Sequence, residues 1–88
     1  MEHLWWDLGL CTAGTDVEVE LRGVEAFVRL LDADNYKDYL DDDEYTYYGG
    51  VWQTSPVVLE VPYDGHWYLV VDGYEGRIKV RQVTTIPG

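Results

Sequence analysis

Cysteine, serine and basic residues are all scarce in this 88-residue chain. The single cysteine, Cys11, excludes an intrachain disulfide and favours a reducing, cytoplasmic setting. The single serine, Ser55, precedes Pro56 and lies outside any Gly-x-Ser-x-Gly motif, so no serine nucleophile is recognisable. No apolar run approaches the roughly 18 residues that a membrane span requires. We expect no cleavable leader either, because the N-terminus lacks a basic region and a long apolar run.

The shortage of basic residues leaves a large negative charge. Six Lys and Arg stand against 17 Asp and Glu, which gives a formal net charge of −11. This charge argues against nucleic acids and membranes as partners, because their phosphates would be repelled, and it leaves basic proteins open. Hydrophobic residues make up 47% of the chain, so we expect a folded rather than a disordered protein. The length predicts one domain over residues 1–88.

Apolar and polar residues alternate along most of the chain, which predicts strands with one buried face. The strand over residues 25–32 is expected to be buried on much of both faces. Trp52, Trp67 and one of Trp5 or Trp6 are expected to fill the core, because a small domain needs large side chains to bury enough area. We predict an all-β fold, an antiparallel β-sandwich or barrel of about seven strands. The expected strands cover residues 3–8, 16–21, 25–32, 44–53, 56–61, 66–72 and 77–83.

Local signals predict the irregular features between and within these strands. Asp64-Gly65 favours a hairpin, since this pair supplies the positive φ angles that tight turns need. A bulge or sharp bend fits Gly49-Gly50, and a second bulge near Arg81-Gln82 would bring Val83 back into phase with the preceding strand. We expect at most one short helical turn, between residues 34 and 40.

An acidic tract interrupts the strand pattern. Seven of the thirteen residues from Asp32 to Glu44 are acidic. Asp32, Asp34 and Asp38 are weak candidates for calcium ligands, but Lys37 stands where an EF-hand loop needs glycine. We therefore interpret the tract as a solvated acidic loop, with no cofactor expected.

The other chemistry-bearing residues form no recognisable catalytic motif. A zinc site built from Cys11, His3 and His66 lacks any standard ligand spacing. Paired carboxylates for hydrolysis need two acids in different environments, which the sequence does not single out. We predict a protein without enzymatic activity. A small metal- or carboxylate-dependent enzyme stays open as the alternative.

Aromatic residues supply the candidate binding surface. Tyr47, Tyr48 and Trp52 flank the glycine pair, and Tyr36 and Tyr39 lie within the acidic tract; exposed rings of this kind give large contact areas at low entropic cost. The partner we expect is a protein of unknown identity and basic character, or a second copy of the chain in a homo-oligomer.

Nucleic-acid mimicry by the carboxylates is a further alternative. Against it stand the basic residues Arg77, Lys79 and Arg81, which are expected to pair across strands with Glu18 and Glu20 and so to cancel charge locally.

Several segments together resemble a known family. Val28-Arg29-Leu30-Leu31-Asp32, Tyr47-Tyr48-Gly49-Gly50, Ser55-Pro56-Val57 and Gly65-His66-Trp67 occur in order, and the resemblance extends over nearly the whole chain. They resemble a small bacterial family known only as a domain of unknown function, number eighteen-eighty-three. The resemblance implies an antiparallel β-sandwich with one bent sheet, described as a pseudo β-prism, and no established activity.

Overall fold

The computed structural model describes residues 4–21, 26–52, 56–72 and 78–83. Seven strands and one short helix are formed by these residues, which confirms the predicted all-β fold. In chain order the elements are β1 (Leu4–Cys11), β2 (Asp16–Leu21), β3 (Ala26–Asp32), α1 (Ala33–Leu40), β4 (Tyr48–Trp52), β5 (Val57–Glu60), β6 (Gly65–Asp72) and β7 (Ile78–Val83).

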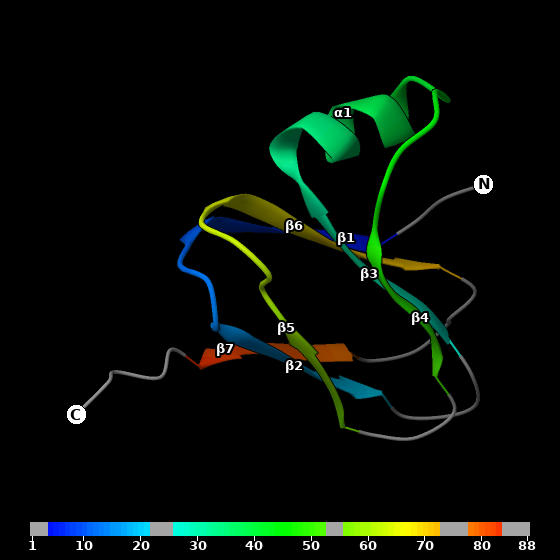
Figure 1. The fold of residues 1–88 in the computed structure, drawn as a ribbon. Coiled ribbons are helices and arrows are strands. Elements are labelled where there is room, and N and C mark those ends of the chain that lie inside the picture. The colour runs from blue at the N-terminus through cyan, green and yellow to red at the C-terminus, as the bar shows by residue number, and fades with distance from the viewer. Residues whose placement is uncertain (1–3, 22–25, 53–55, 73–77, 84–88) are drawn as a thin grey trace.

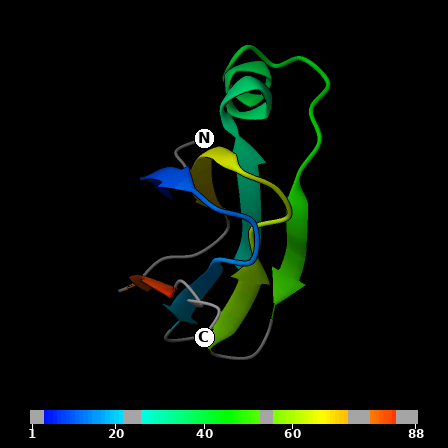
Figure 2. The ribbon, with the colours of Figure 1, turned by 60° about the vertical axis from the view of Figure 1, so that its left-hand side comes forward.

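The strands form two antiparallel sheets that face one another. One sheet has four strands in the order β1-β6-β3-β4, and the other has three in the order β5-β2-β7. In Figure 1 the three-stranded sheet lies below the four-stranded sheet, and α1 lies beyond the four-stranded sheet, on the side away from its partner. Figure 2 shows α1 continuing from the end of β3 and standing clear of the three-stranded sheet. The four-stranded sheet therefore has a core face and an outer face, and α1 lies against the outer face.

The core between the sheets is built by the inward residues of the predicted alternation. Trp67 is fully buried there, and Trp6 and Trp52 are partly buried and pack against this core. Trp5 instead points outward and is 53% exposed. Of the tryptophans expected to fill the core, Trp67 does so, whereas Trp52 and Trp6 only border it. The remaining core residues are small or branched apolar side chains from both sheets, namely Leu8, Cys11, Val17, Val19, Ala26, Val28, Leu30, Val57, Leu59, Val61, Leu69 and Val71.

The predicted hairpin at Asp64-Gly65 is wrong, because β5 and β6 belong to different sheets. The chain leaves the three-stranded sheet at Val61, whose backbone N–H donates to the Thr15 carbonyl and whose carbonyl accepts from Gly14 N–H. Asp64 then accepts a hydrogen bond of 2.7 Å from the Ala13 backbone N–H. These bonds tie the β5–β6 connection to the β1–β2 connection, so the turn carries the chain across the sandwich.

The glycine pair in β4 serves close packing and not a bulge. The β3–β4 register is continuous, with Arg29 opposite Gly49 and Val28 opposite Gly50. Gly49 has a φ of 141°, and a Cβ atom there would collide with the Val28 carbonyl oxygen. Glycine is therefore needed at this position because the backbone of β3 comes too close for a side chain.

The second predicted bulge, near residues 81 and 82, is also wrong. The β2–β7 register runs without a shift from Asp16 opposite Val83 to Leu21 opposite Ile78. A register shift occurs instead in β1, between Asp7 and Gly9. Gly9 has a φ of 72°, a left-handed conformation that suits glycine and lets the strand absorb the additional residue.

Helix α1 lies where a single helical turn was predicted, but its eight residues make about two turns. Asp32 is its N-cap, and the Oδ1 atom of this residue accepts a 2.9 Å hydrogen bond from the Asn35 backbone N–H. The helix ends at Leu40, where Asp41 N–H bonds to the Lys37 carbonyl and Asp42 takes a positive φ of 61°. Within the described ranges, no helix has the length and apolar character that a membrane crossing requires.

Candidate functional site

A buried arginine lies at the centre of the outer face of the four-stranded sheet. Arg29 alternates with the core residues Val28 and Leu30 along β3, so its side chain points away from the core, yet it is only 5% exposed. A charge in such a place is costly unless a counter-charge and hydrogen bonds compensate it. Its Nη2 atom forms an ion pair with Asp72 Oδ2, and its Nη1 atom donates to the Tyr45 hydroxyl.

Aromatic rings complete the surroundings of this guanidinium. Its central carbon lies 4.5 Å from the centre of the Phe27 ring and 4.9 Å from that of Tyr39. Both distances are within the range of cation–π attraction, which is strongest where water is excluded. The Tyr39 hydroxyl also lies 3.5 Å from Asp72 Oδ2. Three rings and one carboxylate therefore surround Arg29, and two of those rings, Tyr39 and Tyr45, come from the segment that includes α1.

The tyrosines of the acidic tract pack down onto this face. Tyr36 stacks on Tyr68 of β6, with ring centres 4.2 Å apart and an angle of 15° between the planes. Burial of the Tyr36 hydroxyl raises its pKa, with a further contribution from Tyr68 and Tyr39. Tyr45 meets Tyr39 edge to face at 5.2 Å, and Tyr47 meets Phe27 in the same way at 5.4 Å. These contacts anchor α1 and the loop after it to the sheet.

Five of the seven carboxylates of the tract face solvent, whereas Asp32 and Asp38 are half-buried. Asp34, Asp41, Asp42, Asp43 and Glu44 are all exposed. Among the described residues, Arg29 forms an ion pair with Asp72, and His66 pairs with Asp7. Neither pair includes a carboxylate between Asp34 and Glu44. The segment is thus two-sided, with tyrosines against the sheet and negative charge toward solvent.

The three weak metal candidates do not converge. Asp32 caps α1 through Oδ1, and its Oδ2 atom accepts from the Tyr63 hydroxyl. Burial raises the pKa of Asp32, but the hydrogen bonds from Tyr63 and Asn35 outweigh that effect and lower it. The same hydrogen bond to Asp32 raises the pKa of Tyr63. Asp34 and Asp38 lie further along the helix, and no group of three metal-ligating side chains is found among the residues described.

The predicted aromatic cluster of β4 is split between the two faces of its sheet. Tyr48 and Trp52 lie opposite the core residues Leu30 and Ala26, so both are on the core side. Tyr48 contacts the rings of Tyr63 and Trp67. Trp52 is half-buried, and its indole nitrogen is buried without a hydrogen-bond partner among the described residues. Tyr47, on the outer side, is the member of the cluster that joins the ring contacts around Arg29.

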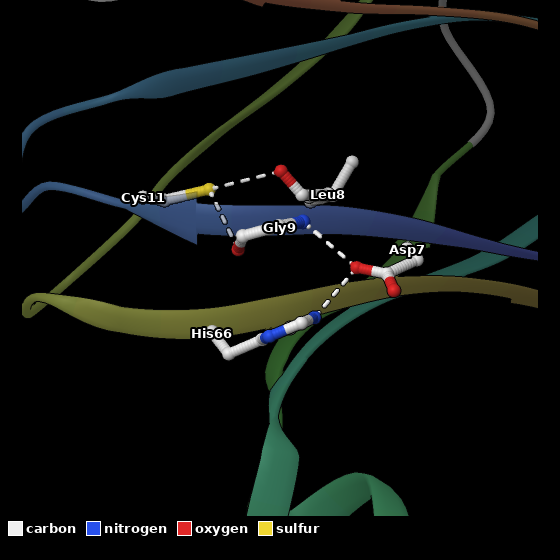
Figure 3. A network of polar contacts seen from close by, with 5 residues as sticks. All are labelled: Asp7, Leu8, Gly9, Cys11 and His66. Carbon is white, nitrogen blue, oxygen red and sulfur yellow. Dashed lines mark hydrogen bonds and ion pairs between the residues drawn. The ribbon is translucent and has the colours of Figure 1, made fainter.

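A second polar network lies where β1 meets β6, and Figure 3 shows it. Asp7 Oδ1 accepts from the Gly9 backbone N–H at 2.8 Å and from His66 Nε2 at 2.6 Å. The Gly9 bond and then the His66 bond lower the pKa of Asp7. The Cys11 thiol points to the carbonyls of Leu8 and Gly9, on the other side of β1 from the imidazole. Burial, reinforced by the charge of Asp7, raises the pKa of this thiol, so it is a poor nucleophile in this setting. His3, the third residue of the zinc hypothesis, lies outside the described residues.

The register of the three-stranded sheet places acidic and basic residues at facing positions. It places Glu18 opposite Arg81 and Glu20 opposite Lys79, the cross-strand arrangement predicted from the sequence. Opposite charges at directly facing positions attract. Arg77 lies outside the described residues. The acidic positions of β2 therefore face basic positions of β7, whereas α1 and the following loop carry a single cation, Lys37, among their carboxylates.

Sequence reasoning missed two residues of the outer face. Arg29 is not among the predicted site residues, although an arginine within the apolar segment of β3 is the signal of a charge that needs a buried partner. Trp5 was treated as one of two interchangeable tryptophans, but its exposed ring lies 6.1 Å from that of Tyr36 on α1. Which of two neighbouring tryptophans faces outward depends on the register of β1 with β6, which local sequence does not specify.

Comparison with known proteins gives one result. A family described as "Domain of unknown function (DUF1883)" matches residues 1–86 of the chain. No curated protein and no solved structure gives a significant match.

Proposed function

The chain belongs to the DUF1883 family, and we propose that it is a non-catalytic protein-interaction module that binds a basic segment of a partner protein. The surface that meets the partner is the outward side of α1 and the loop that follows it, residues 33–47. We further propose a cytoplasmic setting, in line with the single cysteine of the chain and its burial.

The observation that carries this proposal is the two-sided construction of the acidic segment. Its tyrosines are committed to the sheet and to the surroundings of Arg29, so its carboxylates are displayed on an ordered element. Like charges held close together repel one another, which opposes the compact fold unless an opposite charge approaches. A basic partner relieves this repulsion, and the field of the carboxylates also accelerates its diffusional approach.

Self-association is less well supported by the same charges. Two copies that met through this segment would bring two sets of carboxylates together, which like-charge repulsion opposes.

Enzymatic catalysis also has less support, because the carboxylates that lie near other polar groups stabilise the fold. Asp32 caps α1, Asp72 pairs with Arg29, and Asp7 holds the bulge of β1.

The proposal predicts salt-sensitive binding to a simple cationic probe. The probe is fluorescently labelled decalysine, and the Kd is measured by anisotropy at low and at physiological ionic strength. The test protein carries Asp41→Asn, Asp42→Asn and Asp43→Asn. At about 0.5 kcal/mol for each exposed charge pair, these three changes weaken binding by roughly tenfold. Asparagine is chosen because it tolerates the positive φ of Asp42.

A matched control removes the same number of charges from the three-stranded sheet, through Asp16→Asn, Glu20→Gln and Glu60→Gln. Net charge falls equally in both proteins, so a difference between them isolates the position of the charges. The control is expected to bind decalysine within about twofold of the unmodified protein. Equal weakening in both proteins would show that only net charge matters, and absence of binding at low salt would refute the proposal.

A further inference from the structure

The edge where α1 meets β1 exposes a tryptophan that the core does not use. Trp5 is 53% exposed, whereas the other three tryptophans are half-buried or buried. It lies opposite Val70 in the β1–β6 register, and its ring is 6.1 Å from Tyr36 at an angle of 37°. Because Tyr36 is itself stacked on Tyr68, the neighbour of Trp5 is held in place. An aromatic surface that is already ordered loses little entropy when a partner binds to it.

A second exposed apolar residue extends this surface along the helix. Leu40 follows Tyr36 by four residues, so the two lie on the same side of α1, and Leu40 is 56% exposed. Tyr36 therefore connects an exposed tryptophan on the sheet with an exposed leucine on the helix. We call the surface formed by Trp5, Tyr36 and Leu40 the α1–β1 patch. Large apolar side chains gathered in this way at a protein surface mark sites of interaction.

Charged residues of α1 indicate what kind of partner fits. Asp34 and Asp38 are each two residues from Tyr36 and so lie on the other side of α1, but four exposed carboxylates, Asp41 to Glu44, follow directly after Leu40. Lys37 is the one cation of the helix; it is exposed and lies three residues before Leu40. An apolar patch beside several carboxylates and a single lysine is complementary to a segment that combines apolar and basic side chains.

We propose that the α1–β1 patch is the anchor site for an apolar side chain of the basic segment, so that the partner is amphipathic and not merely cationic. This inference rests on the proposed function. The carboxylates attract the segment, and the patch selects among basic segments through the apolar residue that it buries. Aromatic residues near the centre of an interface commonly contribute most of its affinity in this manner.

The test compares two synthetic peptides. One is lysine-rich with leucines at helical spacing, and the other carries serine in place of each leucine. We expect the leucine peptide to bind the unmodified protein about tenfold more tightly than the serine peptide, as burial of one leucine side chain allows. Trp5→Ala abolishes this preference and leaves the affinity for the serine peptide unchanged. Leu40→Ser, on the other element of the patch, reduces the preference in the same way, and Trp5→Phe retains most of it.

Two further variants control for position and for charge. Leu10→Ala removes another exposed apolar side chain of β1, 86% exposed, and is expected to leave the preference intact. Lys37→Ala removes the one helix cation and is expected to tighten the binding of both peptides about twofold, because a like charge is lost. Weaker binding by Lys37→Ala would contradict a cationic partner. Thermal melting and near-ultraviolet circular dichroism establish that each variant is folded.

The outcomes separate this inference from the proposed function. If neither peptide binds, both fail together. A third outcome has three parts: the serine peptide binds, the protein with asparagine at positions 41–43 binds it more weakly, and the leucine peptide binds no more tightly than the serine peptide. In that case the proposed function stands and the anchor site is refuted. Dimerisation in sedimentation velocity that Trp5→Ala abolishes would assign the patch to a second copy of the chain and would likewise refute the inference.

Discussion

Replacing Arg29 tests whether its buried charge holds α1 and the following loop against the sheet. We consider Arg29→Met, because methionine keeps much of the aliphatic stem but removes the guanidinium. The substitution leaves Asp72 without its cation and Tyr45 without its donor, and it removes the positive charge over the rings of Phe27 and Tyr39. Arg29→Lys keeps a charge but lacks the planar group that contacts both Asp72 and Tyr45, so its loss of stability is expected to be intermediate.

The expected magnitude follows from the burial of the two charges. Removing one partner of a buried ion pair costs about 3–5 kcal/mol. The Asp72 side chain is 26% exposed, so water partly solvates the carboxylate that remains and the lower end of that range applies. We therefore expect Arg29→Met to destabilise the fold by about 3 kcal/mol and Arg29→Lys by about half as much. A chain of 88 residues has a total stability of about 4–13 kcal/mol, so the loss is a large share of it.

Two measurements report this loss. Urea unfolding followed by tryptophan fluorescence gives the change in free energy of unfolding, which corresponds to a melting temperature at least 10 °C lower, at about 4–8 °C for each kcal/mol. Hydrogen exchange locates it, since amides of residues 36–47 should lose protection before those of the core strands. A double-mutant cycle with Asp72→Asn should give a coupling energy above about 1 kcal/mol. A stabilising role of the buried charge is refuted if the free energy of unfolding of Arg29→Met lies within about 0.5 kcal/mol of that of the unmodified protein and the cycle shows no coupling.

Two further predictions concern the cap of α1 and the glycine pair of β4. Asp32→Ala should cost about 1 kcal/mol at neutral pH through loss of the N-cap. The pKa of Asp32 is lowered in the folded protein. Its contribution to stability is therefore complete above the unfolded pKa of about 4 and is lost as the pH falls through the folded pKa. Urea unfolding across this range should show the free energies of unfolding of the two proteins converging in acid. Gly49→Ala should destabilise by about 2 kcal/mol or more, because φ is positive there and the added methyl meets the Val28 carbonyl. Gly50→Ala, whose added methyl meets no atom, should be neutral or slightly stabilising, and equal melting temperatures for the two glycine variants would contradict this account.

Much of the local structure was predictable because it follows from patterns two to four residues long. Alternation located the strands, and the burial of both faces of β3 agrees with its sequence, since Leu31 is as fully buried as Leu30 on the opposite face. The two bulges and the hairpin failed for a shared reason. Each depends on which strand lies alongside, and five of the six connections between consecutive strands cross from one sheet to the other. Only β3 and β4, joined through α1, are paired neighbours both in sequence and in the sheet.

The candidate site was predictable in composition but not in orientation. The sequence shows that tyrosines and acids alternate irregularly between residues 32 and 48, and a short helix followed by a loop gives no single period from which to assign faces. What determines the faces is Arg29, a residue of the preceding strand, together with Asp72 of β6. A buried charge needs partners, and these partners can belong to segments that are distant in sequence. Their positions are thus a property of the tertiary structure.

The arrangement around Arg29 has a consequence for binding that composition alone would not suggest. A flexible acidic loop also attracts cations, but it must be ordered when a partner binds, and that ordering reduces the affinity. Here the stacking of Tyr36 on Tyr68 and the contacts of Tyr39 and Tyr45 with Arg29 order the segment in the free protein. The repulsion among its carboxylates is then opposed by packing energy within the fold, and the proposed partner would meet charges that are already in place. Under the proposed function, the stability of the outer face and the affinity for a basic segment are therefore coupled through Arg29.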